Sequence, residues 1–255
     1  MKIAPAAGYF FGVGNNRKVG NVADLLTFAR NAGLPKNGGT CVAATTGPGG
    51  CLAPGRVLQK STGKFFNVGV RCYGFRAHLR FWQDKGLYLI NSAPSIEPEL
   101  LGRSLEGAVW KSGRRPGDWT LLRLHSIGDF SDVPYINAWY EVLRVRPWVE
   151  GFGYTRSWRL PTLLPALDRL RELPNVQIFA SMDDAIFNDG ELWPERWRPA
   201  WMGKPPAALE DAFIFCPENR MPDDPRWIPS CRQCGFCWLA NTQRTRTGVW
   251  FASHF

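Results

Sequence analysis

The pattern of apolar and polar positions is most regular between residues 120 and 216. Four short apolar runs there have the length of buried strands, and turn residues or helical patterns separate them. The runs are residues 121–126 (LLRLHS), 151–155 (GFGYT), 176–180 (VQIFA) and 212–215 (AFIF). We expect each run to be a strand of one sheet.

Two segments between these runs repeat apolar side chains at helical spacing. Residues 133–145 place apolar side chains on one helical face, and residues 161–173 begin with Pro161 and then repeat Leu at that spacing. Strands that alternate with helices in this way are typical of βαβ units with a parallel sheet. We therefore expect an α/β fold whose sheet closes partly or completely into a β/α barrel.

The first third of the chain is less regular. Residues 34–56 are dense in Gly and Pro and predict an irregular loop that carries Cys41 and Cys51. In residues 64–82 the first half favours a strand, and the second half, after Cys72, favours a helix. This part of the chain therefore presents its cysteines on or beside loops.

The segment after Cys216 is rich in Pro and holds four of the seven cysteines. We expect it to fold around those cysteines rather than to form regular elements. The domain organisation that follows is a barrel-like domain over residues 1–215, including the N-terminal cysteine loop. Residues 216–255 form a cysteine-rich, cluster-binding segment packed on that same domain.

Composition and charge narrow the class of protein. No apolar run reaches the ~18 residues of a membrane-spanning helix, and the first residues make a poor signal peptide. We expect a cytoplasmic protein with reduced thiols and no membrane partner. The net charge of +9 and pI near 9.4 favour a polyanionic partner such as nucleic acid. A basic surface without a dedicated partner is the alternative, since the cations are scattered in short clusters.

The spacing of the C-terminal cysteines is typical of a metal site. Cys231, Cys234 and Cys237 form two consecutive CxxC steps, Gly235 permits the tight backbone, and Cys216 lies upstream. Zinc accepts four thiolates but usually takes CxxC pairs that a loop separates. A CxxCxxC run with a distant fourth cysteine is more similar to [4Fe–4S] ligation. We favour one [4Fe–4S] cluster, with zinc and no metal as the alternatives.

Three cysteines remain, Cys41, Cys51 and Cys72. An odd total of seven argues against a closed disulfide framework. Three thiolates hold a [4Fe–4S] cluster with one iron open to a small molecule, as in radical S-adenosylmethionine enzymes. The compact CxxxCxxC of those enzymes is absent here. Two interpretations of these cysteines therefore remain open. They bind a second cluster with S-adenosylmethionine as its ligand, or they are incidental thiols.

Polar side chains follow each predicted strand. In parallel α/β folds the chemistry gathers beyond the carboxyl ends of the strands, so we expect these groups to converge. The residues are His125 and Asp129, then Arg156 and Ser157, then Ser181 and Asp183, and finally Cys216.

Each of these groups has a catalytic and a structural interpretation. Arg156 and the strand-end amides suit an anionic ligand, and His125 or Asp129 suits proton transfer. Alternatively, His125 is a core histidine, Asp129 and Asp183 cap helices, and Arg156 pairs with one of those acids. Our candidate catalytic set is His125, Asp129, Arg156 and Asp183, with Ser157 and Ser181 among the ligand-binding residues.

Several blocks of the sequence together resemble a known family. They are TCVAATTGPGGC, RLHSIGDFSDVPYINAWYEV, GFGYTRSW, PNVQIFASMDD and the C-terminal CP…SCRQCGFCW. In this order they resemble the bacteriophage "gene product 88" family over most of residues 40–238. The front of the chain departs from the family pattern, because Val42 replaces a Pro and either CLA at Cys51 or CYG at Cys72 matches the end of the motif.

The resemblance implies iron–sulfur binding on a barrel-like scaffold similar to radical S-adenosylmethionine proteins, and it implies no particular activity. Two classes of function stay open. One is a radical S-adenosylmethionine-like enzyme. The other is a non-catalytic protein with a structural metal that binds nucleic acid or a host protein, including a former enzyme that now inhibits a host factor. No Walker loop, GxSxG elbow or HExxH motif occurs, which excludes the common nucleotide hydrolases, serine hydrolases and zincins.

Overall fold

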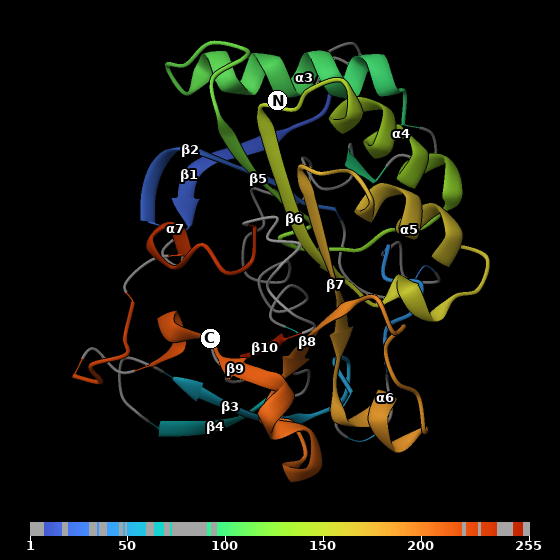
Figure 1. Cartoon of the computed structure of the whole chain (residues 1–255), viewed down its shortest axis with the longest axis vertical. Helices are drawn as coiled ribbons and strands as arrows, with labels where there is room; N and C mark the ends of the chain where they lie inside the picture. Colours follow the sequence, from blue (N-terminus) through green and yellow to red (C-terminus); the bar gives the residue numbers. More distant parts are fainter. Residues whose placement is uncertain are drawn as a thin grey trace.

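An eight-stranded sheet organises the chain, in the order β1-β2-β5-β6-β7-β8-β10-β9 (Figure 1). The structure is a computed structural model. It describes residues 8–16, 20–30, 35, 40–45, 48, 50–59, 64–68, 72, 91–92, 96–220, 223–228, 231–238 and 247–251. The strands are β1 (Phe11–Asn16), β2 (Gly20–Phe28), β5 (Thr120–Leu124), β6 (Val149–Thr155), β7 (Val176–Met182), β8 (Arg198–Met202), β9 (Phe213–Phe215) and β10 (Gly248–Phe251).

The sheet is parallel except at one edge. β1 pairs antiparallel with β2, and every other neighbouring pair is parallel. In the described part of the chain β1 and β9 are the two edges, so the sheet is open and the expected barrel closure is not confirmed. A separate antiparallel hairpin, β3 (Gly55–Gln59) and β4 (Lys64–Val68), lies apart from it.

Helices cover one face of the sheet. They are α3 (Pro98–Lys111), α4 (Val133–Arg144) and α5 (Leu164–Arg171), seen side by side in Figure 1. The helix side carries the main core, in which Trp139, Trp197 and Trp201 are fully buried. The chain has twelve Trp, and part of them therefore serve packing, since aromatic side chains bury a large apolar area. α4 begins where the Asp132 carboxylate accepts a 2.9 Å hydrogen bond from the Tyr135 backbone N–H.

The opposite face carries the C-terminal segment. Phe152 from β6 packs on Trp238, with ring centres 5.7 Å apart, and Phe179 from β7 belongs to a second apolar cluster that includes Cys216. Alternate residues of each strand point to opposite faces, which is why Ile178 joins the helix-side core and Phe179 does not. The cysteine-rich segment thus completes the packing of the sheet.

The predicted elements between residues 120 and 216 are confirmed with small shifts. The four predicted strands are β5, β6, β7 and β9, and the predicted helices are α4 and α5, although α5 begins only at Leu164. The strand expected before Cys72 is β4, whereas the helix expected after Cys72 falls outside the described residues. α3, β1, β2, β8 and β10 were not predicted.

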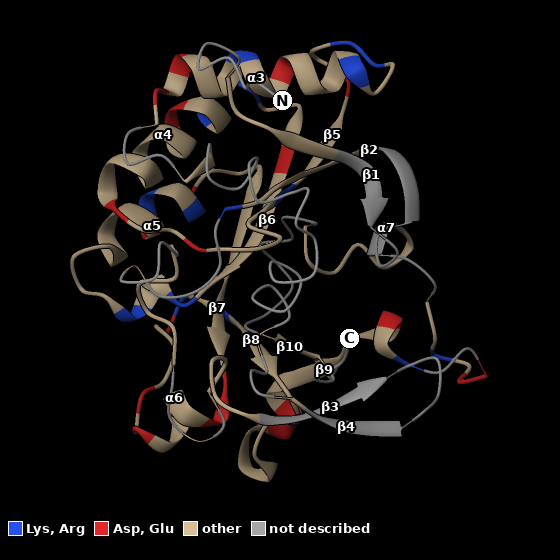
Figure 2. Ribbon diagram, turned by 180° about the vertical axis from the view of Figure 1, so that it is seen from behind, with Lys and Arg blue, Asp and Glu red and all other residues tan. Residues whose placement is uncertain are grey.

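Short helical elements also lie between the strands. They are η3 (Ser157–Arg159), α6 (Asp184–Asn188), η4 (Ala207–Ala212), η5 (Pro217–Asn219) and α7 (Cys231–Cys234). No helix in the described ranges is long and apolar enough to cross a membrane. Charged residues of both signs are spread over the ribbon in Figure 2, with several cations where α3 ends.

Candidate functional site

Side chains from three strand ends and one loop meet at the carboxyl edge of the sheet. Arg156 follows β6, Asp183 follows β7, and Asp129 lies between β5 and α4. All three are buried or nearly so. The prediction that these strand-end groups converge is therefore confirmed for Asp129, Arg156 and Asp183.

The Asp183 carboxylate accepts three hydrogen bonds at this edge. Its carboxylate accepts a 2.7 Å bond from Arg156 Nη2, a 2.7 Å bond from the Thr45 hydroxyl and a 3.1 Å bond from the Ile186 backbone N–H. The last of these caps α6, as one reading of the sequence expected. Asp183 thus joins β6, β7 and the N-terminal cysteine loop.

Asp129 organises the backbone after β6. Its carboxylate accepts bonds from the Thr155 hydroxyl (2.6 Å), the Arg156 N–H (2.9 Å) and the Phe130 N–H (2.8 Å), and its own N–H donates to Thr40 Oγ1 at 3.1 Å. Burial raises the pKa of Asp129, and the hydrogen bonds to the carboxylate oppose that rise only in part. It does not cap α4, a role that Asp132 takes instead.

The Arg156 guanidinium is the positive centre of the site. Burial opposes its charged form, but negative neighbours outweigh burial, so the pKa of Arg156 lies above its usual value. In order of effect these neighbours are Cys51, Asp183, Cys72 and Asp129, and the two cysteines contribute only when they are thiolates. Its Nε atom is buried and has no hydrogen-bond partner in the described part of the chain. Two cysteines and two carboxylates therefore lie around the Arg156 guanidinium.

The N-terminal cysteine loop packs against that point. The Cys51 N–H donates to Thr45 Oγ1 at 2.9 Å, and the Cys72 N–H donates to the Cys51 carbonyl at 2.6 Å. Cys51 is buried, and Cys41 and Cys72 are partly exposed. Cys51 and Cys72, with twenty residues between them, thus lie side by side, and Cys41 belongs to the same loop as Cys51.

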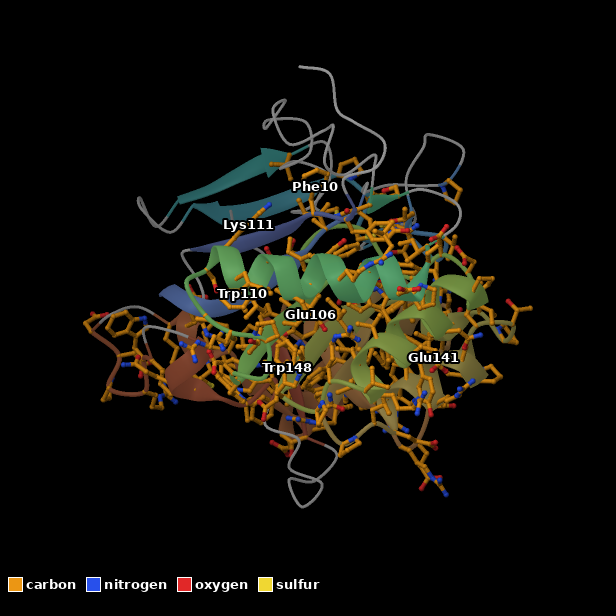
Figure 3. All side chains as sticks on the ribbon, turned by 90° about the horizontal axis from the view of Figure 1, so that it is seen from above. Phe10, Glu106, Trp110, Lys111, Glu141 and Trp148 are labelled. Carbon is orange, nitrogen blue, oxygen red and sulfur yellow. The ribbon has the colours of Figure 1, made fainter. Side chains whose placement is uncertain are left out.

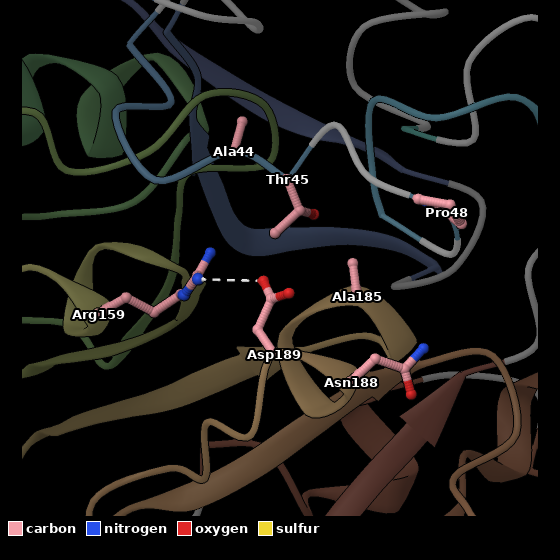
Figure 4. A pocket seen from close by; sticks show the side chains of 7 residues that line it. All are labelled: Ala44, Thr45, Pro48, Arg159, Ala185, Asn188 and Asp189. Atoms are coloured by element: carbon pink, nitrogen blue, oxygen red, sulfur yellow. Dashed lines mark ion pairs between the residues drawn. The ribbon is translucent and has the colours of Figure 1, made fainter.

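A pocket of about 420 Å³ opens between this loop and α6 (Figure 4). Ala44, Thr45 and Pro48 line it from the loop, and Ala185, Asn188 and Asp189 line it from α6. Arg159 completes the wall and lies 3.9 Å from the Asp189 carboxylate. Thr45 is shared between this pocket and the Asp183 network, so the pocket adjoins the buried site.

His125 lies apart from the Arg156 network, in the helix-side core. Its Nε2 lies 2.5 Å from the Tyr135 hydroxyl, and its ring packs against Phe28 and Phe130. Burial, followed by the charge of Arg30, lowers the pKa of His125 well below its usual value. Its backbone has a φ of +55°, a left-handed conformation that is uncommon outside glycine.

Of the two predicted serines, Ser157 holds a backbone carbonyl through its hydroxyl. Ser157 is fully buried, and its hydroxyl donates to the Phe130 carbonyl at 2.6 Å. Ser181 is on β7, and its carbonyl accepts a 3.3 Å bond from the Trp158 indole. Ser157 therefore supports the Asp129 turn.

The C-terminal cysteines lie beneath the other face of the sheet. Cys216 is buried in the apolar cluster of Phe179, Ala200 and Val249, and Cys237 packs against that same cluster. Gly235 has a φ of +68°, so the chain reverses between Cys234 and Cys237. The donor set suits iron–sulfur or zinc ligation chemically. Over the described residues, which exclude the Cys231 side chain, no group of three or more metal ligands is assembled.

The sequence did not draw attention to Arg30. This residue is 2% exposed, follows β2, and donates through Nη1 to Ser131 Oγ at 2.8 Å and to the Asp129 carbonyl at 3.4 Å. Its guanidinium carbon lies 3.9 Å from the centre of the Tyr135 ring. The position of Arg30 directly after a strand could have identified it, but β2 was not predicted from the sequence. Thr45 was missed because a loop Thr carries no spacing signal.

An open, mainly parallel α/β sheet with two cysteine groups, one at its carboxyl edge and one on the face opposite the helices, defines the class of this protein. The sequence model of the gene product 88 family matches residues 14–240, and the chain belongs to that phage family. No curated protein and no solved structure gave a match.

Proposed function

We propose that this protein binds a [4Fe–4S] cluster through Cys216, Cys231, Cys234 and Cys237. The observation that carries the proposal is the meeting of Cys216 and Cys237 on one apolar cluster, although they come from different strands and turns. Thiolates in an apolar, partly buried setting are the usual ligands of such clusters. The CxxCxxC run supplies the remaining two thiolates within one turn.

A buried cation supports this assignment. Arg198 is 8% exposed, donates to the Phe236 carbonyl at 3.3 Å, and lies over the Phe179 ring at 4.6 Å. It therefore brings positive charge to the apolar cluster that holds Cys216 and Cys237. Four thiolates and a cluster carry net negative charge, so a nearby buried cation offsets part of the cost of burial.

A second cluster held by Cys41, Cys51 and Cys72 is the finer part of the proposal. It is supported by the contact between Cys51 and Cys72 and by the Arg156 charge that faces both. Three thiolates leave one iron without a protein ligand. S-adenosylmethionine at that iron would give the protein the chemistry of the radical enzymes whose layout it resembles.

In that enzyme version the chain's own residues have distinct roles. Arg156 presents a cation, with one unpartnered N–H, toward the cysteine loop. Asp183 and Asp129 act as positioning residues, because their oxygens are already bound to Arg156, Thr45 and Thr155. His125 is not part of this constellation, since its described contacts are aromatic core residues and Tyr135.

The test is anaerobic purification with iron, sulfide and zinc quantified per chain, together with a visible spectrum. About eight irons with matching sulfide support both clusters, and about four support one. One zinc without iron would overturn the proposal and would make this a binding protein with a structural zinc.

Variants separate the two sites. Cys234→Ser should remove the C-terminal cluster, and Cys51→Ser should remove the N-terminal one, so each is the matched control of the other. Loss of about four irons in each variant is expected if both clusters exist. The reduced wild-type protein should cleave S-adenosylmethionine, and the Cys51→Ser and Arg156→Met variants should not. An unchanged iron content in Cys234→Ser would reject cluster binding by this tetrad of C-terminal cysteines.

A further inference from the structure

Two tryptophans stand exposed where α3 leads into β5. Trp110 is 60% exposed at the end of α3, and Trp119 is 40% exposed just before β5. Burying an indole contributes strongly to stability, so an exposed pair is unusual in a surface that has no partner. Both lie at the amino end of the sheet, away from the edge that carries Arg156 and the N-terminal cysteines.

Further apolar surface adjoins them. Trp148 is partly buried just before β6, and its carbonyl accepts a 2.9 Å bond from the Thr120 N–H, which places it beside Trp119. Val145, which is 57% exposed, ends α4. Figure 3 shows Trp110, Lys111 and Trp148 on this side of the molecule. We call Trp110, Trp119, Trp148 and Val145, with the loop between the first two, the tryptophan edge.

The tryptophan edge is also basic. Lys111, Arg114 and Arg115 lie between Trp110 and Trp119, against a single carboxylate, Asp118. Figure 2 shows cations where α3 ends. In the described structure neither Lys111 nor Arg115 has an ion pair, and the Asp118 carboxylate accepts a 2.8 Å bond from the Arg115 backbone N–H. The Arg114 guanidinium is instead fixed to the Trp119 carbonyl.

One ion pair joins the two helices that carry part of this edge. Arg146 Nη2 lies 2.8 Å from Glu106 Oε1, and this pair ties the end of α4 to α3. The rings and the free cations are therefore displayed on a fixed frame. A fixed display of indoles lowers the entropic cost of binding, since few side chains need to be ordered.

We propose that the tryptophan edge binds single-stranded nucleic acid. Exposed indoles offer stacking surfaces for unpaired bases, and the unpaired cations offer contacts to phosphates. The net charge of +9 adds long-range attraction for a polyanion. The clustered cations and the positive net charge suit a polyanion, so they favour nucleic acid over a protein partner. This inference is independent of the proposed iron–sulfur sites.

The test is fluorescence anisotropy of labelled oligothymidylate and oligouridylate with the holoprotein at several salt concentrations. Trp110→Ala/Trp119→Ala should weaken binding by at least about tenfold, because each stacked base contributes substantially to affinity. Trp110→Phe should keep most of the affinity, since a phenyl ring still stacks. Lys111→Ala/Arg115→Ala should weaken binding and flatten its dependence on salt.

Matched controls come from the far side of the chain. Leu192→Ala removes an apolar side chain that is 59% exposed, and Lys204→Ala removes an exposed cation that pairs with Glu210. Both should bind like the wild type. Near-UV circular dichroism and thermal unfolding should show that every variant is folded, which the exposure of the replaced side chains favours.

Three results would overturn the proposal. One is the absence of oligonucleotide binding by wild-type protein at low salt. Another is unchanged affinity in the double Trp variant while the cation variant loses binding, which would indicate non-specific attraction. The third is capture of a host protein that depends on Trp110 and Trp119 without any affinity for oligonucleotides. Because the cysteines play no part in this test, its outcome leaves the iron–sulfur proposal untouched.

Discussion

Arg156 Nη2 lies 2.7 Å from the Asp183 carboxylate, and the two side chains are 12% and 0% exposed. The pair joins the carboxyl ends of two neighbouring strands under the N-terminal cysteine loop. A buried pair is costly to break because the remaining charge has no water to replace its partner. This relationship gives the site its rigidity.

Asp183→Ala should lower the free energy of unfolding by about 3–5 kcal/mol, since it leaves Arg156 buried without its closest charge and removes the cap of α6. Urea unfolding measures this. Arg156→Met/Asp183→Ala should lose less than the sum of the single variants. The exposed pair Arg144 and Glu141 is the control, and Arg144→Ala should change stability little. Additive losses would contradict the coupling.

Gly128 carries a second, steric constraint. Its φ is +85°, and a Cβ there would lie 2.7 Å from Thr40 Oγ1 and 2.9 Å from the Arg30 carbonyl oxygen. Gly128→Ala should destabilise the fold by about 2–4 kcal/mol, from both backbone conformation and overlap. Gly190 is the control, because its φ is +79° but a Cβ there would meet open space. Gly190→Ala should therefore cost only the backbone strain, about 1–2 kcal/mol. Equal losses in thermal unfolding would reject the steric argument.

His125 should make stability depend on pH. Its pKa is lowered in the folded state, so the unfolded state binds the proton first as pH falls. The stability is fully present above the unfolded value of about 6.5 and is lost as pH falls through the window below it, by about 1.4 kcal/mol for each unit of depression. His125→Asn, which tolerates a positive φ, should be less stable but should lack this slope. Parallel pH profiles of variant and wild type would contradict the assignment.

Removing the metal should loosen the C-terminal segment, a prediction that rests on the proposed tetrad. Trp238 is 4% exposed against Phe152, and Cys237 packs on the same apolar cluster. Anaerobic chelation should therefore speed hydrogen exchange in residues 231–238, because metal binding and folding are linked. Residues 133–144 of α4 serve as the internal control. Equal protection with and without metal would show that packing alone holds the segment.

The sequence predicted those strands and helices whose apolar pattern is visible within the element itself. β5, β6 and β7 are uninterrupted apolar runs, and α4 and α5 repeat apolar residues at helical spacing. α3 also carries a signal, with Pro98 at its start and Leu101, Leu105 and Val109 buried on one face. It was missed although the pattern is present.

Other strands could not be recognised from local pattern. β8 begins with Arg198 and Pro199, and β10 has only four residues. Both are strands because they pair with parallel neighbours that are distant in sequence. Barrel closure was expected because βαβ units often close, but closure depends on pairing between the two edges, which no local pattern encodes.

The candidate site was predictable in outline only. We predicted that Asp129, Arg156 and Asp183 lie close together because each follows a parallel strand, and parallel strands align their carboxyl ends. It also included His125, whose left-handed backbone belongs to the core environment of Phe130 and Tyr135. Side-chain direction at a turn depends on φ and ψ, which the residue type does not reveal.

The position of β10 has a consequence for the order in which the protein is made. β9, which leads to Cys216, is bonded in the described sheet only to β10, and β10 lies at residues 248–251. The ribosome therefore completes every cysteine before it completes the strand that anchors the first of the C-terminal four. The segment that follows Cys216 can therefore complete its packing only after residues 248–251 have been made, and a chain cut short before Gly248 would carry all seven cysteines without the strand that β9 pairs with in the described sheet.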